Sequence, residues 1–179
     1  MSTSDTVIKL AELTGKTAAR VEPPFVLTGE ERHAIEHEVA HYPDGRAASI
    51  GALKIIQASR GWVPDGAIAP VAEIIGIGAA ELEGVATFYS LIFRKPVGRH
   101  VIKVCDSISC FLTGYDEIRA ALERALGIRY GQTTADGRFT LLPICCLGAC
   151  DKGPTLMIDD DLHGDVTPDK VATMLEAYK

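Results

Sequence analysis

Four of the five cysteines in this 179-residue chain lie in two tight pairs, and this arrangement restricts the possible fold more than any other feature of the sequence. Cys105 and Cys110 are separated by four residues, and Cys146 and Cys150 are separated by three. Four thiolates brought to one point form the donor set of an iron–sulfur cluster or of a zinc site. The pairs therefore predict a metal centre built from two loops.

Each cysteine pair begins just after a predicted strand. Residues 100–104 and 139–144 are rich in β-branched and apolar side chains, which favours short strands. Sites in α/β sheets form where strands pass into loops. Zinc remains an alternative because four cysteines also suit a structural zinc site. Cys145 is a second alternative, since its distance from Cys150 repeats the four-residue gap of the first pair, so spacing alone does not choose between Cys145 and Cys146.

Composition and charge exclude several classes of protein. The net charge is −6 and the pI is about 5.3, so we expect no basic face for nucleic acid. Residues 1–21 lack the apolar core of a signal peptide. The most apolar stretch, 71–80, is interrupted by Glu73 and is too short to cross a bilayer. We therefore expect a soluble protein of a reducing compartment, with no direct membrane insertion and no disulfides.

The hydrophobic pattern changes near residue 97 and predicts an N-terminal helical bundle followed by an α/β domain. The expected segments are a flexible arm over 1–26, the bundle over 27–96 and the second domain over 97–179. We expect helices over 28–41, 46–60, 64–75, 79–89, 115–126 and 167–178, and strands over 100–104, 139–144 and 155–158. Thr28 and Glu31 have the spacing of a capping box, and Asp136-Gly137 is typical of a hairpin turn.

Three further motifs point to other chemistry. His37-Glu38-Val39-Ala40-His41 fits the zinc-protease pattern, but the helix must end at Pro43 and no third ligand is evident, so we expect a solvated helix face. Gly76-Ile77-Gly78 lacks the third glycine and the preceding strand of a dinucleotide loop. Arg94-Lys95 and Arg99-His100 form a basic patch, either a solvated loop or a docking edge for an acidic partner.

The cysteine motifs and two others resemble one family. The chain is similar to the thioredoxin-like [2Fe–2S] subunits of NADH-quinone oxidoreductase, which include the E subunit of bacterial respiratory complex I and the mitochondrial flavoprotein 2 subunit. The resemblance runs from about Leu27 to Lys179. It is carried by Cys105-Asp106-Ser107-Ile108-Ser109-Cys110, Cys146-Leu147-Gly148-Ala149-Cys150, Gly84-Val85-Ala86-Thr87-Phe88-Tyr89 and Arg60-Gly61-Trp62-Val63-Pro64.

This resemblance implies a fold, a cofactor and a ligand set. The second half would be a thioredoxin-like [2Fe–2S] ferredoxin domain. One [2Fe–2S] cluster would be bound by Cys105, Cys110, Cys146 and Cys150. The family's three-residue spacing in the second pair selects Cys146, and it leaves Cys145 as a neighbour that is not a ligand.

The resemblance also implies a role within a proton-translocating NADH:quinone oxidoreductase. This chain would exchange single electrons with FMN, and both FMN and the NADH site would belong to its partner, the flavin-binding F subunit of complex I. The two proteins would form a stable heterodimer in a peripheral arm on the cytoplasmic side of the inner membrane. We expect no general acid, base or nucleophile in this chain.

Two other functions remain open. The same module could serve an NAD-linked formate dehydrogenase or hydrogenase. A free-standing [2Fe–2S] ferredoxin is a further alternative, but a simple electron carrier does not need the helical bundle that precedes the cysteines.

Overall fold

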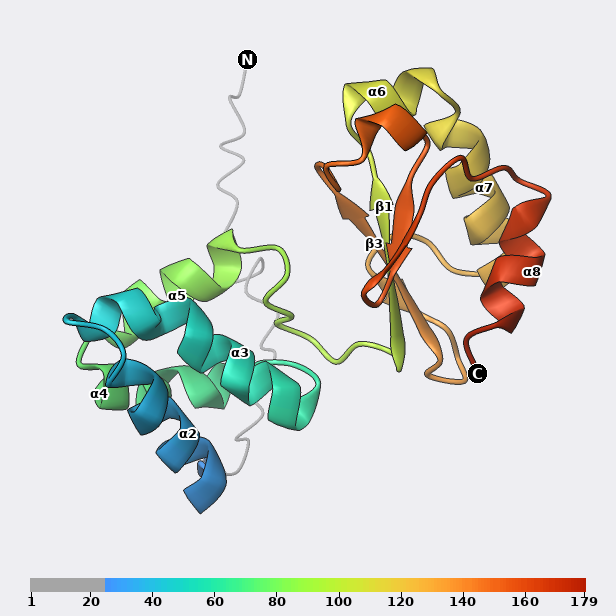
Figure 1. Cartoon of the computed structure of the whole chain (residues 1–179). Coiled ribbons are helices and arrows are strands. Elements are labelled where there is room, and N and C mark those ends of the chain that lie inside the picture. The colour runs from blue at the N-terminus through green and yellow to red at the C-terminus, as the bar shows by residue number, and fades with distance from the viewer. Residues whose placement is uncertain (1–24) are drawn as a thin grey trace, which may run out of the picture.

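The computed structural model describes residues 25–179, with helices in the first half and a mixed sheet in the second (Figure 1). The predicted arm over 1–26 lies outside the described residues, except for Phe25 and Val26. No helix in the described range is long and apolar enough to span a bilayer.

The four predicted helices of the first half are confirmed, with shifts at their ends. The segments are α2 (Gly29–Val39), a 3₁₀ turn η1 (Gly45–Ala48), α3 (Ser49–Arg60), a second turn η2 (Asp65–Ala67), α4 (Ile68–Ile75) and α5 (Ala79–Phe88). Pro64 has an extended backbone, so it precedes the turn η2 and is not the first residue of α4.

The start of α2 is fixed by the predicted capping box. The Glu31 N–H donates to the Thr28 hydroxyl at 3.1 Å, and the Thr28 N–H donates to the Glu31 carboxylate at 2.9 Å. The carboxylate of Glu31 also forms two 2.6 Å contacts with Arg60 at the end of α3. One ion pair therefore fastens the first helix to the second beside a core formed by α2–α5.

The second half is a five-stranded sheet in the order β2-β3-β1-β4-β5. Its strands are β1 (His100–Cys105), β2 (Gln132–Thr133), β3 (Phe139–Ile144), β4 (Leu156–Ile158) and β5 (Asp161–His163). Only β1 and β3 run parallel among these strands. Helices α7 (Tyr115–Leu126) and α8 (Lys170–Glu176) lie side by side and pack on the sheet (Figure 1).

The sequence prediction missed three short elements of this half. β2 and β5 are two and three residues long, too short to show an alternating pattern. The third is α6 (Ile108–Leu112), five residues within the first cysteine loop. The predicted last helix is shorter than expected, because α8 begins at Lys170.

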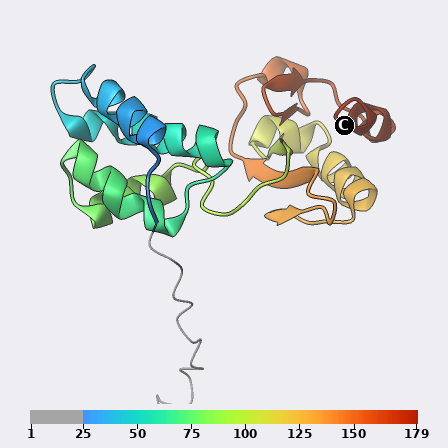
Figure 2. The same cartoon turned by 90° about the horizontal axis from the view of Figure 1, so that it is seen from below.

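The two halves are joined by a single segment over 93–99 (Figure 2). Each half has its own cluster of buried apolar side chains. Arg94 anchors the segment to the helices through the carbonyl of Val63 at 2.7 Å, and the Gly98 N–H donates to the Thr140 hydroxyl of β3 at 2.6 Å. The predicted boundary between residues 96 and 97 falls within this segment.

Candidate metal centre

The two cysteine loops leave the sheet next to each other. β1 and β3 are parallel neighbours, and Cys105 at the end of β1 pairs with Ile144 at the end of β3. The Asp106 N–H donates to the Ile144 carbonyl at 3.0 Å, so the pairing continues one residue into the first loop. Both loops therefore start at the same edge of the sheet, and each follows a strand, as the sequence predicted.

The first pair lies inside the protein. Cys105 and Cys110 are 2% and 1% exposed. Cys110 is held in α6, and its sulfur lies 3.4 Å from the hydroxyl of Thr155. Thr155 directly precedes β4, the other neighbour of β1, so three segments of the chain meet at these two sulfurs.

The surroundings favour the thiolate of Cys105 over that of Cys110. Burial raises the pKa of the Cys105 thiol, but the N–H groups of Ser107 and Leu147 face its sulfur and lower the pKa below its ordinary value. Burial also raises the pKa of Cys110, and the neighbouring Cys105 raises it further. Leu147 belongs to the second cysteine loop, so one loop supplies a hydrogen-bond donor to a sulfur of the other.

The second loop presents its cysteines at the surface. Cys145, Cys146 and Cys150 are all exposed. The Gly148 N–H donates to the sulfur of Cys146 at 3.3 Å, and Gly148 has a φ of 76°, a left-handed conformation that favours glycine. Cys150 begins a 3₁₀ turn, η3 (Cys150–Lys152).

The donor set suits an iron–sulfur cluster. Thiolates are the usual ligands of such clusters, and N–H groups directed at the sulfurs stabilise their negative charge. The structure supplies such donors to Cys105 and Cys146, one in each pair. Among residues 25–179, no three Cys, His, Asp or Glu side chains lie close enough to hold a metal ion, so the ligand set stays a prediction.

The competing motifs do not form sites in the described structure. His37 lies on α2 and His41 in the turn that follows, because α2 ends at Val39, two residues before the predicted end; both are exposed, with ring centroids 4.7 Å apart. Gly76 and Gly78 link two helices, α4 and α5, so the strand of a dinucleotide loop is absent there. Arg94 is paired with Asp65 and Glu83 at 2.8 Å each, which leaves Lys95 and Arg99 as the exposed part of the basic patch.

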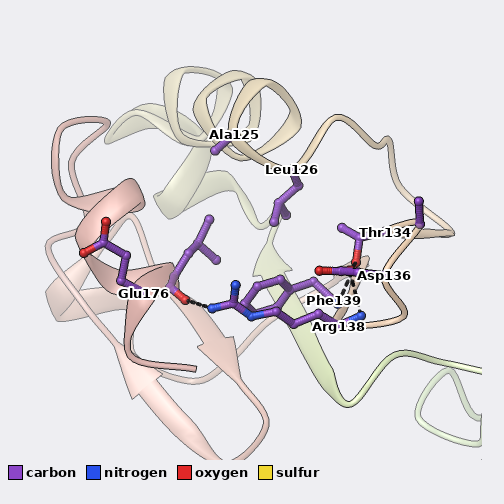
Figure 3. A pocket seen from close by; sticks show the side chains of 9 residues that line it. Ala125, Leu126, Thr134, Asp136, Arg138, Phe139 and Glu176 are labelled. Carbon is purple, nitrogen blue, oxygen red and sulfur yellow. Dashed lines mark hydrogen bonds between the residues drawn. The ribbon is translucent and has the colours of Figure 1, made fainter. Parts of the chain in front are cut away.

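A shallow pocket of about 400 Å³ lies at the other end of β3 (Figure 3). It is lined by the end of α7, the β2–β3 turn and α8. The guanidinium of Arg138, which points across the pocket, already donates to the carbonyls of Leu175 and Tyr178 at 2.7 and 2.6 Å. Phe139 in this pocket and Ile144 beside the cysteines are the two ends of β3, so the pocket is not part of the cysteine site.

A comparison with known protein families identifies the family to which this chain belongs. The sequence profile of the thioredoxin-like [2Fe–2S] ferredoxin family matches residues 35–179. The chain belongs to this family. As a thioredoxin-like [2Fe–2S] ferredoxin it holds one [2Fe–2S] cluster, and the predicted fold class is confirmed.

Two relatives of this ferredoxin are both E subunits of an NADH-quinone oxidoreductase. The E subunit of the NADH-quinone oxidoreductase of Pseudomonas aeruginosa is 65% identical over 86% of this chain and 93% of its own length. The same subunit of Escherichia coli strain K12 is 63% identical over 87% of this chain and 93% of its own length. An NAD⁺-reducing [NiFe]-hydrogenase shares the fold, with a TM-score of 0.62, 23% identity and coverage of 73% of this chain and 22% of that chain.

The sequence reasoning missed Thr155 and Leu147, which surround the first cysteine pair. Thr155 belongs to no motif, and Leu147 lies in the second cysteine loop, whose motif does not indicate which sulfur its N–H faces. Leu147 acts through its main-chain N–H, which every residue other than proline has, so its side chain carries no signal. Thr155 reaches Cys110 only because β4 pairs with β1.

Proposed function

We propose that this chain is the electron-transfer subunit of an NADH:quinone oxidoreductase, in which its [2Fe–2S] cluster exchanges single electrons with the flavin of a partner. The observation that carries the proposal is the pair of cysteine loops at one sheet edge, in a chain 65% identical to the E subunit of such an enzyme. A cluster accepts one electron at a time, whereas NADH delivers two as hydride, so a flavin must stand between them.

Cys105, Cys110, Cys146 and Cys150 are the proposed ligands of the cluster. The first pair is buried and fixed by β1 and α6, so it would bind the inner iron. The second pair is exposed, so it would bind the outer iron, nearer the protein surface. The Gly148 N–H on Cys146 supports Cys146 over Cys145, because it directs a hydrogen-bond donor at that sulfur.

The chain's own residues hold the cluster and stabilise its charge. The cluster supplies one-electron redox chemistry. N–H groups of Ser107, Leu147 and Gly148 face ligand sulfurs and offset the cost of placing a negative centre beside a protein core. One-electron transfer to and from the cluster requires no proton transfer by any side chain of this chain.

The proposed partner is the flavin-binding F subunit of complex I, which would carry FMN and the NADH site. Three apolar side chains beside the cysteines support a contact: Ile108, Phe111 and Leu112 of α6 are 68%, 52% and 77% exposed. Phe88, at the end of α5, is 80% exposed and offers apolar surface on the helical half. Large apolar contacts of this kind are typical of permanent complexes.

The whole enzyme would sit as a peripheral arm on the cytoplasmic side of the inner membrane and would couple the reaction to proton translocation. This chain would reach the membrane only through its partners. Of the two proposed domains, the one over 97–179 would bind the cluster and contact the partner through α6, and the one over 27–96 would add contact surface at Phe88.

The test is metal analysis and electron paramagnetic resonance of the full chain, purified without oxygen. A [2Fe–2S] protein contains about two irons and two sulfides per chain and gives a signal only after one-electron reduction. Zinc in the protein, without visible absorption, would falsify the proposal. A reduced cluster that is not reoxidised by the flavoprotein would instead contradict the electron partner.

A further inference from the structure

Thr155 is a buried residue beside the cysteines that belongs to no recognised motif. It is 2% exposed, and its hydroxyl lies 3.4 Å from the sulfur of Cys110. The Thr155 carbonyl accepts a hydrogen bond from the Cys105 N–H at 3.2 Å. Both the main chain and the side chain of Thr155 therefore contact the first cysteine pair.

The direction of the hydrogen bond follows from the state of the sulfur. In the protein without its cluster, either the thiol or the hydroxyl can be the donor. A cysteine that binds iron does so as a thiolate and has no proton to give. The Thr155 hydroxyl must then be the donor to a ligand sulfur, since a buried hydroxyl without a partner carries a desolvation cost.

Such a donor affects the two redox states unequally. Reduction adds one electron, and part of the added negative charge resides on the cysteine sulfurs. A hydrogen bond to an acceptor strengthens as the acceptor becomes more negative. The donor therefore stabilises the reduced cluster more than the oxidised one and raises the reduction potential, which hydrogen bonds to sulfur are known to set.

We propose that Thr155 is a positioning residue that raises the reduction potential of the cluster by donating a hydrogen bond from its hydroxyl to the sulfur of Cys110. The inference rests on the proposed ligands Cys105 and Cys110. One electron enters or leaves the cluster, no bond is made or broken, and the proton remains on the Thr155 oxygen throughout. Thr155 thereby helps to determine whether an electron stays on this cluster or returns to the flavin.

The experiment compares Thr155→Val, Thr155→Ser and Thr140→Val in the full chain loaded with its cluster. Valine keeps the shape and removes the hydroxyl, whereas serine keeps the hydroxyl. Thr140 is a matched control, because it is 3% exposed and its hydroxyl bonds to Thr133 at 2.7 Å, away from the cysteines. The readout is a redox titration followed by electron paramagnetic resonance, which needs no enzyme activity.

In Thr155→Val we expect the ratio of reduced to oxidised cluster at a given potential to fall by about three- to tenfold. A tenfold change corresponds to about 59 mV for one electron. In Thr155→Ser and Thr140→Val we expect the ratio to stay within about twofold of the wild type. Circular dichroism checks that each variant is folded.

An unchanged potential in Thr155→Val overturns the proposal. If that variant does not fill with cluster, Thr155→Ala is measured in its place, and an unchanged potential there has the same meaning. Loss of the cluster in both, with retention in Thr155→Ser, also overturns it, since the hydroxyl would then serve assembly. A wild-type chain without a [2Fe–2S] cluster contradicts the proposed function instead, so the two failures are distinguishable.

Discussion

Cys105 and Ile144 lie opposite each other at the ends of two parallel strands, and this pairing brings the two cysteine loops together. The parallel arrangement matters because parallel neighbours end at the same edge of a sheet. Antiparallel strands would have sent the loops to opposite edges. The Leu147 N–H that faces the Cys105 sulfur is a direct consequence of this shared edge.

Exchange of single cysteines tests the ligand set. We expect Cys146→Ser to lose or strongly alter the cluster, because serine replaces a proposed ligand that receives the Gly148 N–H. We expect Cys145→Ser, its neighbour in the same exposed loop, to keep the cluster. Iron content and the visible spectrum are the measurements. The opposite result would mean that the assignment is wrong by one residue.

Gly153 tests how tightly the first pair is packed. A Cβ at this position would lie 2.8 Å from the Thr113 hydroxyl and 3.7 Å from the Cys110 sulfur. The Thr113 hydroxyl is held by the Ser109 carbonyl at 2.9 Å, so it cannot move freely. We expect Gly153→Ala to lower the free energy of unfolding by about 1–3 kcal/mol and to reduce cluster content.

The control for Gly153→Ala is Gly84→Ala. Gly84 lies within α5, where an added Cβ meets no atom within 4 Å. Alanine there should leave stability unchanged or raise it by up to about 1 kcal/mol. Equal cluster content in the two variants would show that the space around Gly153 accepts a Cβ without disturbing the first cysteine pair.

Low pH should lower the stability of the helical half by protonating Glu31. The hydrogen bonds from Arg60 lower the pKa of this 3% exposed carboxyl to about 2. A carboxyl whose pKa is depressed on folding stabilises the protein above its unfolded pKa, and this contribution is lost as the pH falls. We expect the ionised Glu31 carboxylate to add about 3 kcal/mol to the free energy of unfolding at pH 7. This contribution should be lost between about pH 5 and pH 2.

Glu31→Gln measures this contribution by chemical unfolding at pH 7. We expect a loss of about 3–5 kcal/mol, because the change leaves the Arg60 charge without its partner. The control is Glu36→Gln on the same helix, where the side chain is about half exposed and its contact with Arg32 is 3.9 Å. Equal stability of the two variants would contradict the role of Glu31.

His37 on α2 and His41 just after it should have no catalytic role. His37 and His41 are exposed, and no third ligand joins them within the described residues. We expect a variant with His37→Ala and His41→Ala to transfer electrons within a few-fold of the wild type, since surface changes rarely affect a distant site. Peptidase activity that chelators abolish, and that this variant lacks, would revive the protease interpretation.

The exposed side of α6 should contact the flavoprotein. We expect Leu112→Glu to weaken co-purification with the flavin-binding partner, because a charge would enter an apolar interface. Leu162→Glu on β5, where the leucine is 44% exposed, is the control and should bind normally. The wild-type complex should survive moderate salt. A wild-type complex that dissociates by about 0.3 M salt, where surface charges are largely screened, would favour the free ferredoxin.

The sequence alone determined the local elements and the type of site. Thr28 and Glu31 fixed the start of α2, and the apolar periodicity of Tyr115–Leu126 predicted α7 with its observed bounds. Two cysteine pairs after two strands indicated a metal centre at a sheet edge. These signals are visible in sequence because caps, periodic faces and paired ligands depend on residues close together in the chain.

The tertiary structure decided how distant segments meet. The register of β1 against β3 and β4 brings Leu147 to the sulfur of Cys105 and Thr155 to the sulfur of Cys110, and no local pattern records that register. It also decided that the first cysteine pair is buried and the second exposed, although both follow strands. Burial and strand register depend on the packing of the whole sheet, so a local reading of the sequence does not contain them.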